Sequence, residues 1–411
     1  MYRTASRLIY TTFRNYYTVK PNLDKKQYDL AKQIYQKIKA MGPIPVSDYM
    51  KEVLIHPSQG YYINREPMGE SGDFITSPEL SQIFGEMIAI WFLNEWSKVG
   101  APKPFQIVEL GPGRGTLMQD ILRVFKHFDS LKQANISLVE ISPVLSDSQA
   151  RRLCATTNLN PDQNAVIYRE GMSIIENIPV KWYKTLQDVP NVFTLLIANE
   201  FFDALPINKF KKTDLGYREI LIDIDKDKEG CFRYVLAKEE TPTQKLFLRS
   251  DESRENFEIS PQSLLMIKEI ATRIESDGGF CLIADYGHNG EGTDTFRAFK
   301  DHKQHDPLID PGSADLTADV DFAAIKRAGV EDGKVLAFGP VTQRDFLIKM
   351  GIEHRIKVLE ENADEKQLKS LRFGYDMLMN LEKMGERFKF MALVPSVLEG
   401  ILKKVPVVGF H

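Results

Sequence analysis

A glycine-rich turn between two acids supplies the first residues that could do chemistry. The turn reads Gly111-Pro112-Gly113-Arg114-Gly115, with Glu109 two residues ahead of its first glycine and Glu140 at the end of the next apolar run. Glycine lets a backbone approach a ligand where a Cβ would collide, and the start of a following helix offers unpaired N–H donors. An acid in the place of Glu140 accepts hydrogen bonds from two ribose hydroxyls. The residues therefore predict a nucleotide-type cofactor held by Gly111, Gly113, Gly115 and Glu140.

The spacing of the glycines bears on which cofactor this is. Dinucleotide sites use G-x-G-x-x-G, whereas the turn here is G-x-G-x-G. Together with Glu109, that pattern resembles the first motif of class I S-adenosylmethionine methyltransferases. An acid at this point suits a cationic amino group and a sulfonium, and it suits a pyrophosphate poorly. We expect S-adenosyl-L-methionine as cofactor, with Glu109 at its amino acid moiety. A dinucleotide, and a glycine turn that binds no ligand, stay open as alternatives.

Two further buried runs end in acids that are candidates for catalysis. Residues 192–198 are followed by Asn199-Glu200-Phe201-Phe202-Asp203, and residues 280–284 are followed by Asp285. Open α/β sheets bind their ligands at the carboxyl ends of strands, where these acids would lie. Glu200 and Asp203 are the first choice for a catalytic role and Asp285 is the second. The plainer alternative for each is a loop cap or a surface ion pair.

Alternating strands and helices would position these residues. Short apolar, β-branched runs predict parallel strands, and apolar residues at helical spacing between them predict helices. The fold class is therefore α/β and Rossmann-like. The expected strands are 105–110, 136–139, 181–185, 192–198, 280–284, 334–338 and 387–394, and the expected helices include 142–153, 261–274, 321–328 and 342–350.

Composition narrows the class of protein. The chain has 411 residues, with 53 Lys and Arg against 57 Asp and Glu, so its net charge of −4 gives no sign of a general nucleic-acid binder. No run of 18 apolar residues exists to span a membrane, and we expect a soluble protein. Three widely spaced cysteines indicate a reducing compartment, and the scattered histidines suggest no metal site.

The first 23 residues differ from the rest. They carry Arg3, Arg7, Arg14 and Lys20 with many hydroxyl side chains, and the first acid is Asp24. This composition is typical of a mitochondrial transit peptide. A disordered basic tail is the alternative, and a secretory signal is disfavoured because arginines interrupt its apolar core.

The layout that we expect has four parts. Residues 1–23 are the transit peptide, and 24–100 are an N-terminal helical region with a glycine- and hydroxyl-rich loop at 69–79 that is either a lid or a surface loop. Residues 101–395 form the cofactor domain, with an inserted hairpin at about 216–258 and a loop excursion at about 288–320. A C-terminal tail, 396–411, follows.

The chain resembles the MidA-like methyltransferases over nearly its whole length after the predicted transit peptide. The stretches that carry the resemblance are "GDFITSPELSQIFGE", "VELGPGRGTLMQD", "VEISPVLSDSQ", "ANEFFDALP", "IADYG", "DTFRAFKDH", "PGSADLTADVDF" and "FGPVTQRDFL". The resemblance implies a seven-stranded, Rossmann-like methyltransferase with insertions. It also implies that Asp73, Thr76 and Ser77 close the cofactor site from the lid.

The resemblance further implies a substrate and a place in the cell. The implied reaction is symmetric dimethylation of an arginine on a subunit of respiratory complex I, which assembly of the complex requires. The implied location is the mitochondrial matrix. In that reaction, carboxylates such as Glu200 and Asp203 would orient the guanidinium and accept a proton. A non-catalytic assembly chaperone that keeps the fold is the alternative, and a dinucleotide-dependent dehydrogenase is a third, disfavoured one. The sequence leaves the oligomeric state open.

Overall fold

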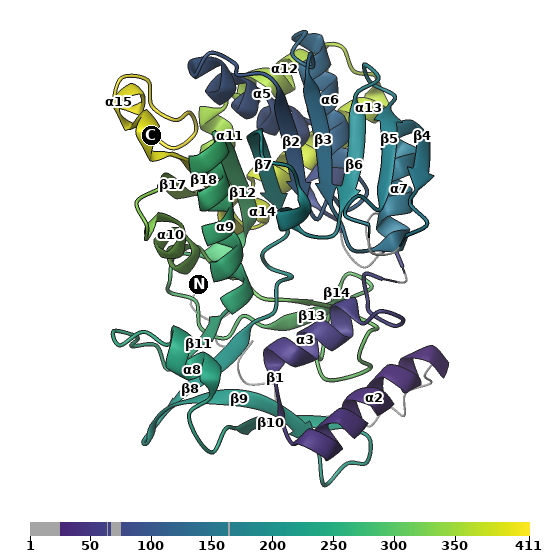
Figure 1. Cartoon of the computed structure of the whole chain (residues 1–411), viewed down its shortest axis with the longest axis vertical. Coiled ribbons are helices and arrows are strands. Elements are labelled where there is room, and N and C mark those ends of the chain that lie inside the picture. Colours follow the sequence, from purple (N-terminus) through teal and green to yellow (C-terminus); the bar gives the residue numbers. More distant parts are fainter. Residues whose placement is uncertain (1–24, 64, 67–74, 163–164) are drawn as a thin grey trace.

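A ten-stranded sheet forms the centre of the computed structural model, which describes residues 25–411 apart from 64, 67–74 and 163–164 (Figure 1). The predicted transit peptide therefore lies outside the described residues. Nine strands follow the order β17-β18-β12-β7-β2-β3-β6-β5-β4, and β16 (Val320–Asp321) pairs with β12 beside them. Their bounds are β2 Phe105–Leu110, β3 Ala134–Val139, β4 Cys154–Leu159, β5 Arg169–Ser173, β6 Pro179–Tyr183, β7 Phe193–Asn199, β12 Gly279–His288, β17 Val335–Thr342 and β18 Phe388–Pro395.

Seven of these strands confirm the predicted α/β fold. The order β6-β3-β2-β7-β12-β18-β17 has parallel neighbours from β6 to β12, with β18 antiparallel to both of its neighbours. The chain runs outward from β2 to β3 and β6, then returns to place β7 on the other side of β2. Such a reversal of strand order is where open α/β sheets bind ligands. The sheet extends past β6 into β5 and β4, which the sequence did not predict.

Helices cover both faces of this sheet. Because β2 is buried along its whole length, alternate residues enter two cores, with Phe105 and Ile107 on one face and Val108 and Leu110 on the other. The helices of the first core are α5 Gln82–Lys98, α6 Thr116–His127, α7 Pro143–Leu153, α11 Gln343–Lys349, α12 Ile352–Glu361 and α13 Glu365–Met379, and those of the second are α9 Pro261–Asp277 and α10 Phe322–Val330. None of the described helices has the length and apolar character needed to cross a bilayer.

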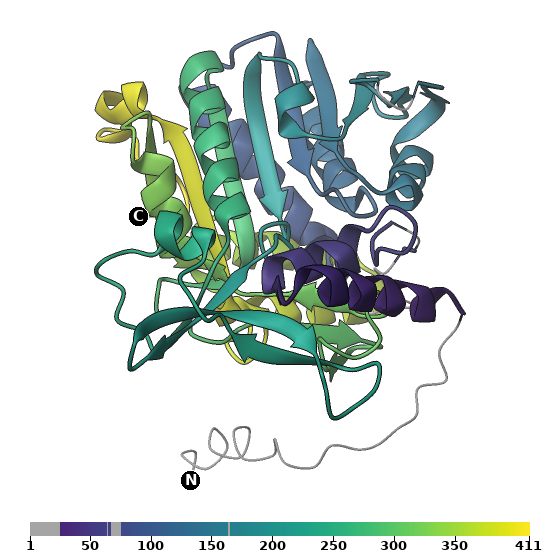
Figure 2. The ribbon, with the colours of Figure 1, turned by 60° about the horizontal axis from the view of Figure 1, so that its bottom comes forward.

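A second body of structure lies across the carboxyl ends of the strands (Figures 1 and 2). Two small sheets and two helices share one apolar core there, which contains Tyr49, Ile222 and Leu316. The first sheet has β1 Ile44–Pro45, β8 Asn208–Thr213, β9 Gly216–Ile224, β10 Phe232–Leu236 and β11 Asn256–Ile259, the second has β13 Arg297–Lys300, β14 Lys303–His305 and β15 Asp315–Thr317, and the helices are α2 Lys25–Met41 and α3 Val46–Ile55.

The predicted insertions are more structured than the sequence indicated. The hairpin β9–β10 lies in the insertion predicted at about 216–258, but that insertion also contains helix α8 (Pro242–Phe247) and the first three residues of β11. Region 24–100 is divided between two cores, because α2 and α3 pack in the second body while α5 packs on the central sheet.

The last residues pack back onto the central body. They include the short elements η2 (Ser396–Leu398) and α15 (Glu399–Leu402), while α4 (Ser77–Leu80), η1 (Leu186–Asp188) and α14 (Met384–Arg387) are the other short helices. Trp91 Nε1 in α5 donates to the carbonyl of Val408 at 3.0 Å, and Val407 is buried. The stretch 396–411 therefore caps the helices that support the cofactor side of the sheet.

Candidate functional site

The glycine turn joins β2 to α6 at the point where the strand order reverses. Gly111, Gly113 and Gly115 have φ angles of +60°, +53° and +79°, in the left-handed region that side chains with a Cβ rarely adopt. A Cβ on Gly111 would lie 3.0 Å from the ring of Phe201, and the carbonyl of Gly113 accepts a hydrogen bond of 2.7 Å from Gln149 Nε2. The turn is thus held in a shape that only glycine allows.

A cavity of about 690 Å³ opens beside this turn, between the central sheet and the second body. It brings together residues that are far apart in the sequence, at the carboxyl ends of β2, β3 and β7. The predicted site residues that line it are Thr76, Glu109, Gly111, Gly113, Glu140, Glu200 and Asp203. Gly115 instead begins helix α6 behind the cavity, and Asp73 lies outside the described residues.

Glu109 presents a carboxylate that has spare capacity for a ligand. Its side chain is buried, and its Oε2 atom has no hydrogen-bond partner among the described residues. Burial, together with repulsion from Glu140 and Asp120, raises the pKa of Glu109 well above its usual range. Asn199 Oδ1, at the end of β7, also lacks a described partner. Both atoms would gain from a cationic donor placed in the cavity.

Glu140 is fixed in place by its neighbours. Its Oε1 atom accepts from the backbone N–H of Ser142 at 2.7 Å, and Oε2 accepts from Gln149 Nε2 at 2.9 Å. Burial raises the pKa of Glu140 to about 7, and these donors partly offset the effect of burial. The same Gln149 side chain bonds the carbonyl of Gly113, so the glycine turn and the acid are held as one unit.

Helix α4 closes the cavity next to the turn. The backbone N–H of Ser77 donates to Glu200 Oε1 at 2.8 Å. Glu79 binds both Arg114, at 3.2 Å, and the hydroxyl of Thr116. The segment that contains Thr76 and Ser77 thus connects the candidate catalytic acid to the cofactor turn, while residues 67–74 of the predicted lid lie outside the described residues.

Glu200 and Asp203, which follow β7, and Asp285, which lies within β12, form one cluster with different contacts. Glu200 lines the cavity with a φ of +49°, which is a strained backbone for a residue with a Cβ. Burial raises the pKa of Glu200 to about 7, partly offset by the Ser77 N–H. Asp203 also lines the cavity, and no described residue donates a hydrogen bond to its carboxylate.

Asp285 is fully buried beneath that turn and does not line the cavity. Its Oδ2 atom accepts from the backbone N–H groups of Phe201, Phe202 and Asp203 at 2.9–3.3 Å, and Oδ1 accepts from Tyr286 N–H at 2.9 Å. These contacts favour a positioning role for Asp285 over the direct role that the sequence suggested.

The far wall of the cavity comes from residues that the sequence analysis did not select. They are Tyr62, Arg297, Asp315 and Thr317. Tyr62 donates to Asp315 Oδ1 at 2.7 Å across 253 positions of sequence. No local pattern signals a contact of that range, although "PGSADLTADVDF" already carried part of the family resemblance.

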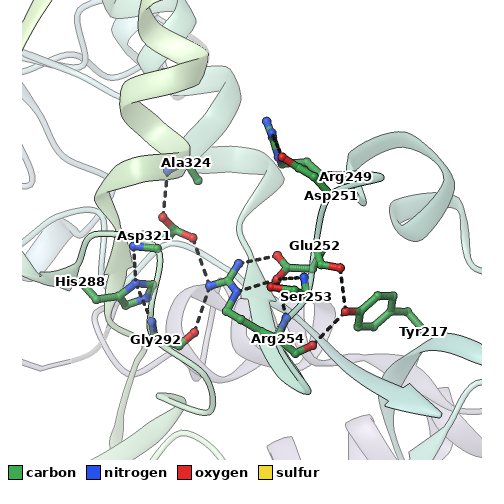
Figure 3. A network of polar contacts seen from close by, with 11 residues as sticks. Tyr217, Arg249, Asp251, Glu252, Ser253, Arg254, His288, Gly292, Asp321 and Ala324 are labelled. Atoms are coloured by element: carbon green, nitrogen blue, oxygen red, sulfur yellow. Dashed lines mark hydrogen bonds and ion pairs between the residues drawn. The ribbon is translucent and has the colours of Figure 1, made fainter.

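A separate ion network holds the second body in place (Figure 3). Arg254 binds Glu252 through two hydrogen bonds of 2.7 and 2.9 Å, and it reaches Asp321 at 3.4 Å. It also donates to the carbonyl of Gly292 at 3.0 Å, whose own N–H donates to His288 Nδ1. Asp321 caps helix α10 through Ala324 N–H. The network thus ties the segment before β11 to both ends of the excursion.

The sequence comparison identifies the class of protein. Residues 87–341 match a family described as "Putative S-adenosyl-L-methionine-dependent methyltransferase". The chain belongs to this family, which confirms both the predicted MidA-like membership and the predicted cofactor.

Curated relatives resemble the chain over most of its length. The mitochondrial protein arginine methyltransferase NDUFAF7 of Homo sapiens is 50% identical over 371 residues, which cover 89% of this chain and 83% of the human protein. The mitochondrial NDUFAF7 homolog of Drosophila melanogaster is 48% identical over 386 residues, which cover 93% and 88% of the two chains.

Solved structures share the fold. A crystal structure from Burkholderia thailandensis, described as a "likely methyl transferase" bound to S-adenosyl-homocysteine, aligns with a TM-score of 0.73 at 23% identity, and the alignment covers 92% of this chain and 95% of that one. A second structure from that organism gives a TM-score of 0.71, with 23% identity and the same coverage.

The cavity residues of this chain fit S-adenosyl-L-methionine. Glu109 Oε2 and Asn199 Oδ1 offer acceptor atoms without described partners, as a cationic amino group requires. Glu140 lines the cavity and is held in place by Ser142 and Gln149, and the turn at Gly111 and Gly113 leaves room for close approach of a ligand.

Proposed function

We propose that the chain transfers methyl groups from S-adenosyl-L-methionine to an arginine of a respiratory complex I subunit in the mitochondrial matrix, with symmetric dimethylation that assembly of the complex requires. The human and Drosophila relatives are named as mitochondrial protein arginine methyltransferases, which supports the reaction class. The MidA-like resemblance supports the complex I subunit and the matrix. We further propose residues 1–23 as the transit peptide that directs import.

One observation carries the choice of a cationic acceptor. The end of the cavity beyond Glu200 is walled by buried carboxyl groups, and burial together with Asp285 and Asp315 raises the pKa of Asp203 well above its usual range. Carboxyl groups in that state gain more from a cation than from a neutral ligand, because the cation offsets both desolvation and mutual repulsion. A guanidinium also carries several N–H donors that match carboxylate oxygens.

The cofactor end is assigned from the same contacts. Glu109 would hold the amino group, the turn Gly111–Gly115 would lie along the ligand, and Glu140 would accept from the ribose hydroxyls. Thr76 and Ser77 would close the site, with Asp73 in the loop before them. When bound, S-adenosyl-L-methionine supplies an electrophilic methyl group, whose bond to sulfur breaks as its bond to nitrogen forms, leaving the electron pair on a neutral thioether.

The chain's own residues must overcome the low nucleophilicity of the guanidinium. Asp203 would hold the charged group and keep its positive charge on the nitrogens that do not react. Glu200 would take the proton that the reacting nitrogen releases, since a pKa of about 7 suits a base in the neutral range. Ser77 N–H orients Glu200, and Asp285 fixes the backbone from which both acids project.

Mass spectrometry of complex I subunits tests the function. Cells that lack the protein should lose a dimethylarginine and assembled complex I, and the wild-type chain should restore both. Gly113→Val, which places a branched side chain at a positive φ in the turn, should bind no S-adenosyl-L-methionine and restore neither.

Two outcomes would contradict the proposed function. If Gly113→Val restores assembly without methylation, the chain acts as an assembly chaperone that keeps a methyltransferase fold. If no arginine methylation depends on the wild-type chain, the substrate class is wrong.

A further inference from the structure

Strand β15 presents alternate residues to the cavity. It pairs antiparallel with β13, so that Asp315 faces Phe299 and Thr317 faces Arg297 in the register. Because side chains alternate along a strand, these four share one face, and all four line the cavity. The intervening Leu316 lies in the apolar core of the second body. The excursion therefore serves as a wall of the site.

Asp315 lies close to Asp203 through a direct link between their chain segments. The backbone N–H of Ala318 donates to the carbonyl of Asp203 at 3.0 Å. The Asp315 charge is one of the causes that raise the pKa of Asp203, after burial and Asp285. Two carboxyl groups from different bodies of the protein thus face the same space, as a guanidinium bound from two sides would require.

Tyr62 holds Asp315 from the N-terminal side. Its hydroxyl donates to Asp315 Oδ1 at 2.7 Å, and burial, followed by the charge of Asp315, raises the pKa of Tyr62 well above its usual range. The phenol therefore keeps its proton and remains a donor. The carbonyl of Tyr62 accepts from the hydroxyl of Ser142, whose N–H binds Glu140. Tyr62 thus connects the cofactor acid to the acid of the far wall.

The cations nearby are engaged elsewhere or exposed. Arg297 Nη2 binds Asp319 at 2.6 Å, and its Nη1 donates to the carbonyl of Thr295. Arg387 lines the cavity but is solvent-exposed. The ionisable groups that face the far end are Tyr62, Glu200, Asp203, Tyr286, Arg297, Asp315 and Arg387, with Asp285 beneath them. An added positive charge at this end would offset the burial of Asp203 and its repulsion by the neighbouring acids.

We propose that Asp203 and Asp315 bind the acceptor guanidinium from opposite sides of the cavity, and that Tyr62 positions Asp315 for this contact. The inference rests on the proposed function and deepens it. It assigns part of acceptor recognition to the excursion, outside the seven-stranded fold. Asp315 is a substrate-binding residue in this arrangement, whereas Tyr62 acts only through Asp315.

A binding titration separates this inference from the proposed function. N-acetyl-arginine amide and its neutral analogue N-acetyl-citrulline amide are titrated into the full chain loaded with S-adenosyl-homocysteine. The wild type should prefer the arginine probe. Asp315→Asn should lower affinity for that probe about 10-fold or more and leave the citrulline affinity and the cofactor affinity unchanged. Asp294→Asn is the matched control, because Asp294 lies on the same excursion but pairs with Lys209 outside the cavity.

Tyr62→Phe supplies a second variant that keeps the ring. It should weaken arginine binding about 3- to 5-fold through loss of one hydrogen bond to Asp315. In methylation assays on mitochondrial extract from cells lacking the protein, it should raise KM with kcat nearly unchanged. A purely structural role would instead lower the unfolding midpoint and the affinity for S-adenosyl-homocysteine together.

Three outcomes would contradict this inference. If the wild type prefers arginine and Asp315→Asn prefers it equally, Asp315 is not part of the acceptor site, and the proposed function stands. If the wild type shows no preference for arginine over citrulline, the carboxylate pair and the proposed substrate class both fail. If Asp294→Asn weakens arginine binding as much as Asp315→Asn, general charge and not a direct contact explains the result.

Discussion

Two groups of carboxylates in this protein have opposite surroundings. In the Arg254 network, Glu252 and Asp321 share one guanidinium, with 11–17% of each side chain exposed (Figure 3). In the cavity, Glu200 accepts from Ser77 N–H and the Asn199 amide, Asp203 lies among other acids, and no described cation forms an ion pair with either. The first group has the cation that its burial requires, and the second lacks it.

The pKa shifts of these acids follow the difference in their surroundings. Burial alone would raise the pKa of Glu252, but hydrogen bonds from Arg254 lower it below its usual value. Burial raises the pKa of Glu200 to about 7, and it raises that of Asp203 well above its usual range. A buried acid with a cation supports the fold, whereas a buried acid without one weakens the fold and keeps a place for a cationic ligand.

Arg254→Met should have the largest effect, because it leaves the acids of the network buried without a cation, as the cavity acids are. Glu252 and Asp321 would lose their shared cation, and we expect a loss of about 3 kcal/mol in the free energy of unfolding. Urea denaturation measures this value. Arg254→Lys should recover only part of it, since a lysine lacks the two-pronged geometry. Affinity for S-adenosyl-homocysteine should stay normal below the unfolding transition, and unchanged stability would contradict the role of the network.

Asp203→Asn should have the opposite effect on stability. Removing a buried acid without a cation should leave the unfolding midpoint unchanged or higher at pH 8, while methylation falls about 100-fold, which corresponds to about 2.7 kcal/mol. Thermal unfolding and a methyl-transfer assay measure the two effects. A variant that is both destabilised and active would show that Asp203 is a structural acid like Glu252.

Glu200→Gln should affect turnover more than binding. We expect kcat to fall about 30-fold and the acid limb of the pH–rate profile near pH 7 to flatten, because glutamine cannot accept the proton. Isothermal titration with S-adenosyl-homocysteine should give wild-type affinity. If the acid limb persists in the variant, another group is the base.

The central fold could be predicted because its signals are local. Residues 105–110 are buried, and the glycine turn follows them at once. Ser142-Pro143 begins helix α7 as expected, with Ser142 accepting from Leu145 N–H. Strand β4 escaped prediction because its residues are largely exposed at the edge of the sheet. Strand β11 escaped prediction because the charged residues that precede it resemble an exposed loop in the sequence, whereas Arg254 is paired with the distant Asp321 in the structure.

The residues of the candidate site could be predicted only where they adjoin a strand or turn that the local sequence marks. Glu109 and Glu140 adjoin the strand and turn that define the motif, so their position near a cofactor could be expected. Asp315 and Tyr62 depend on a contact between the excursion and the N-terminal region, which no pattern in one sequence specifies. Asp285 follows the predicted strand 280–284 as Glu200 follows 192–198, but β12 continues to His288, and four backbone donors hold Asp285 as a supporting acid within the sheet.

The smallest expected effect is a difference in the pH dependence of stability between the two groups. The pKa of Glu140 rises from 4.5 to about 7 on folding, so the folded protein binds more protons than the unfolded chain between these values. Stability without cofactor should therefore fall as pH rises from 5 to 8. Glu140→Gln removes this contribution, and its stability relative to wild type should improve by about 2 kcal/mol across that range.

Glu252→Gln supplies the control of opposite sign. The folded pKa of Glu252 is lowered, so its contribution to stability is present above its unfolded value of 4.5 and is lost as pH falls through the folded value. Relative to wild type, Glu252→Gln should be least stable at neutral pH and should approach wild type only in acid. Urea denaturation of both variants at pH 4, 5, 6, 7 and 8 measures the two slopes. Slopes of the same sign would mean that the contrast between the paired acids and the cavity acids does not govern their ionisation.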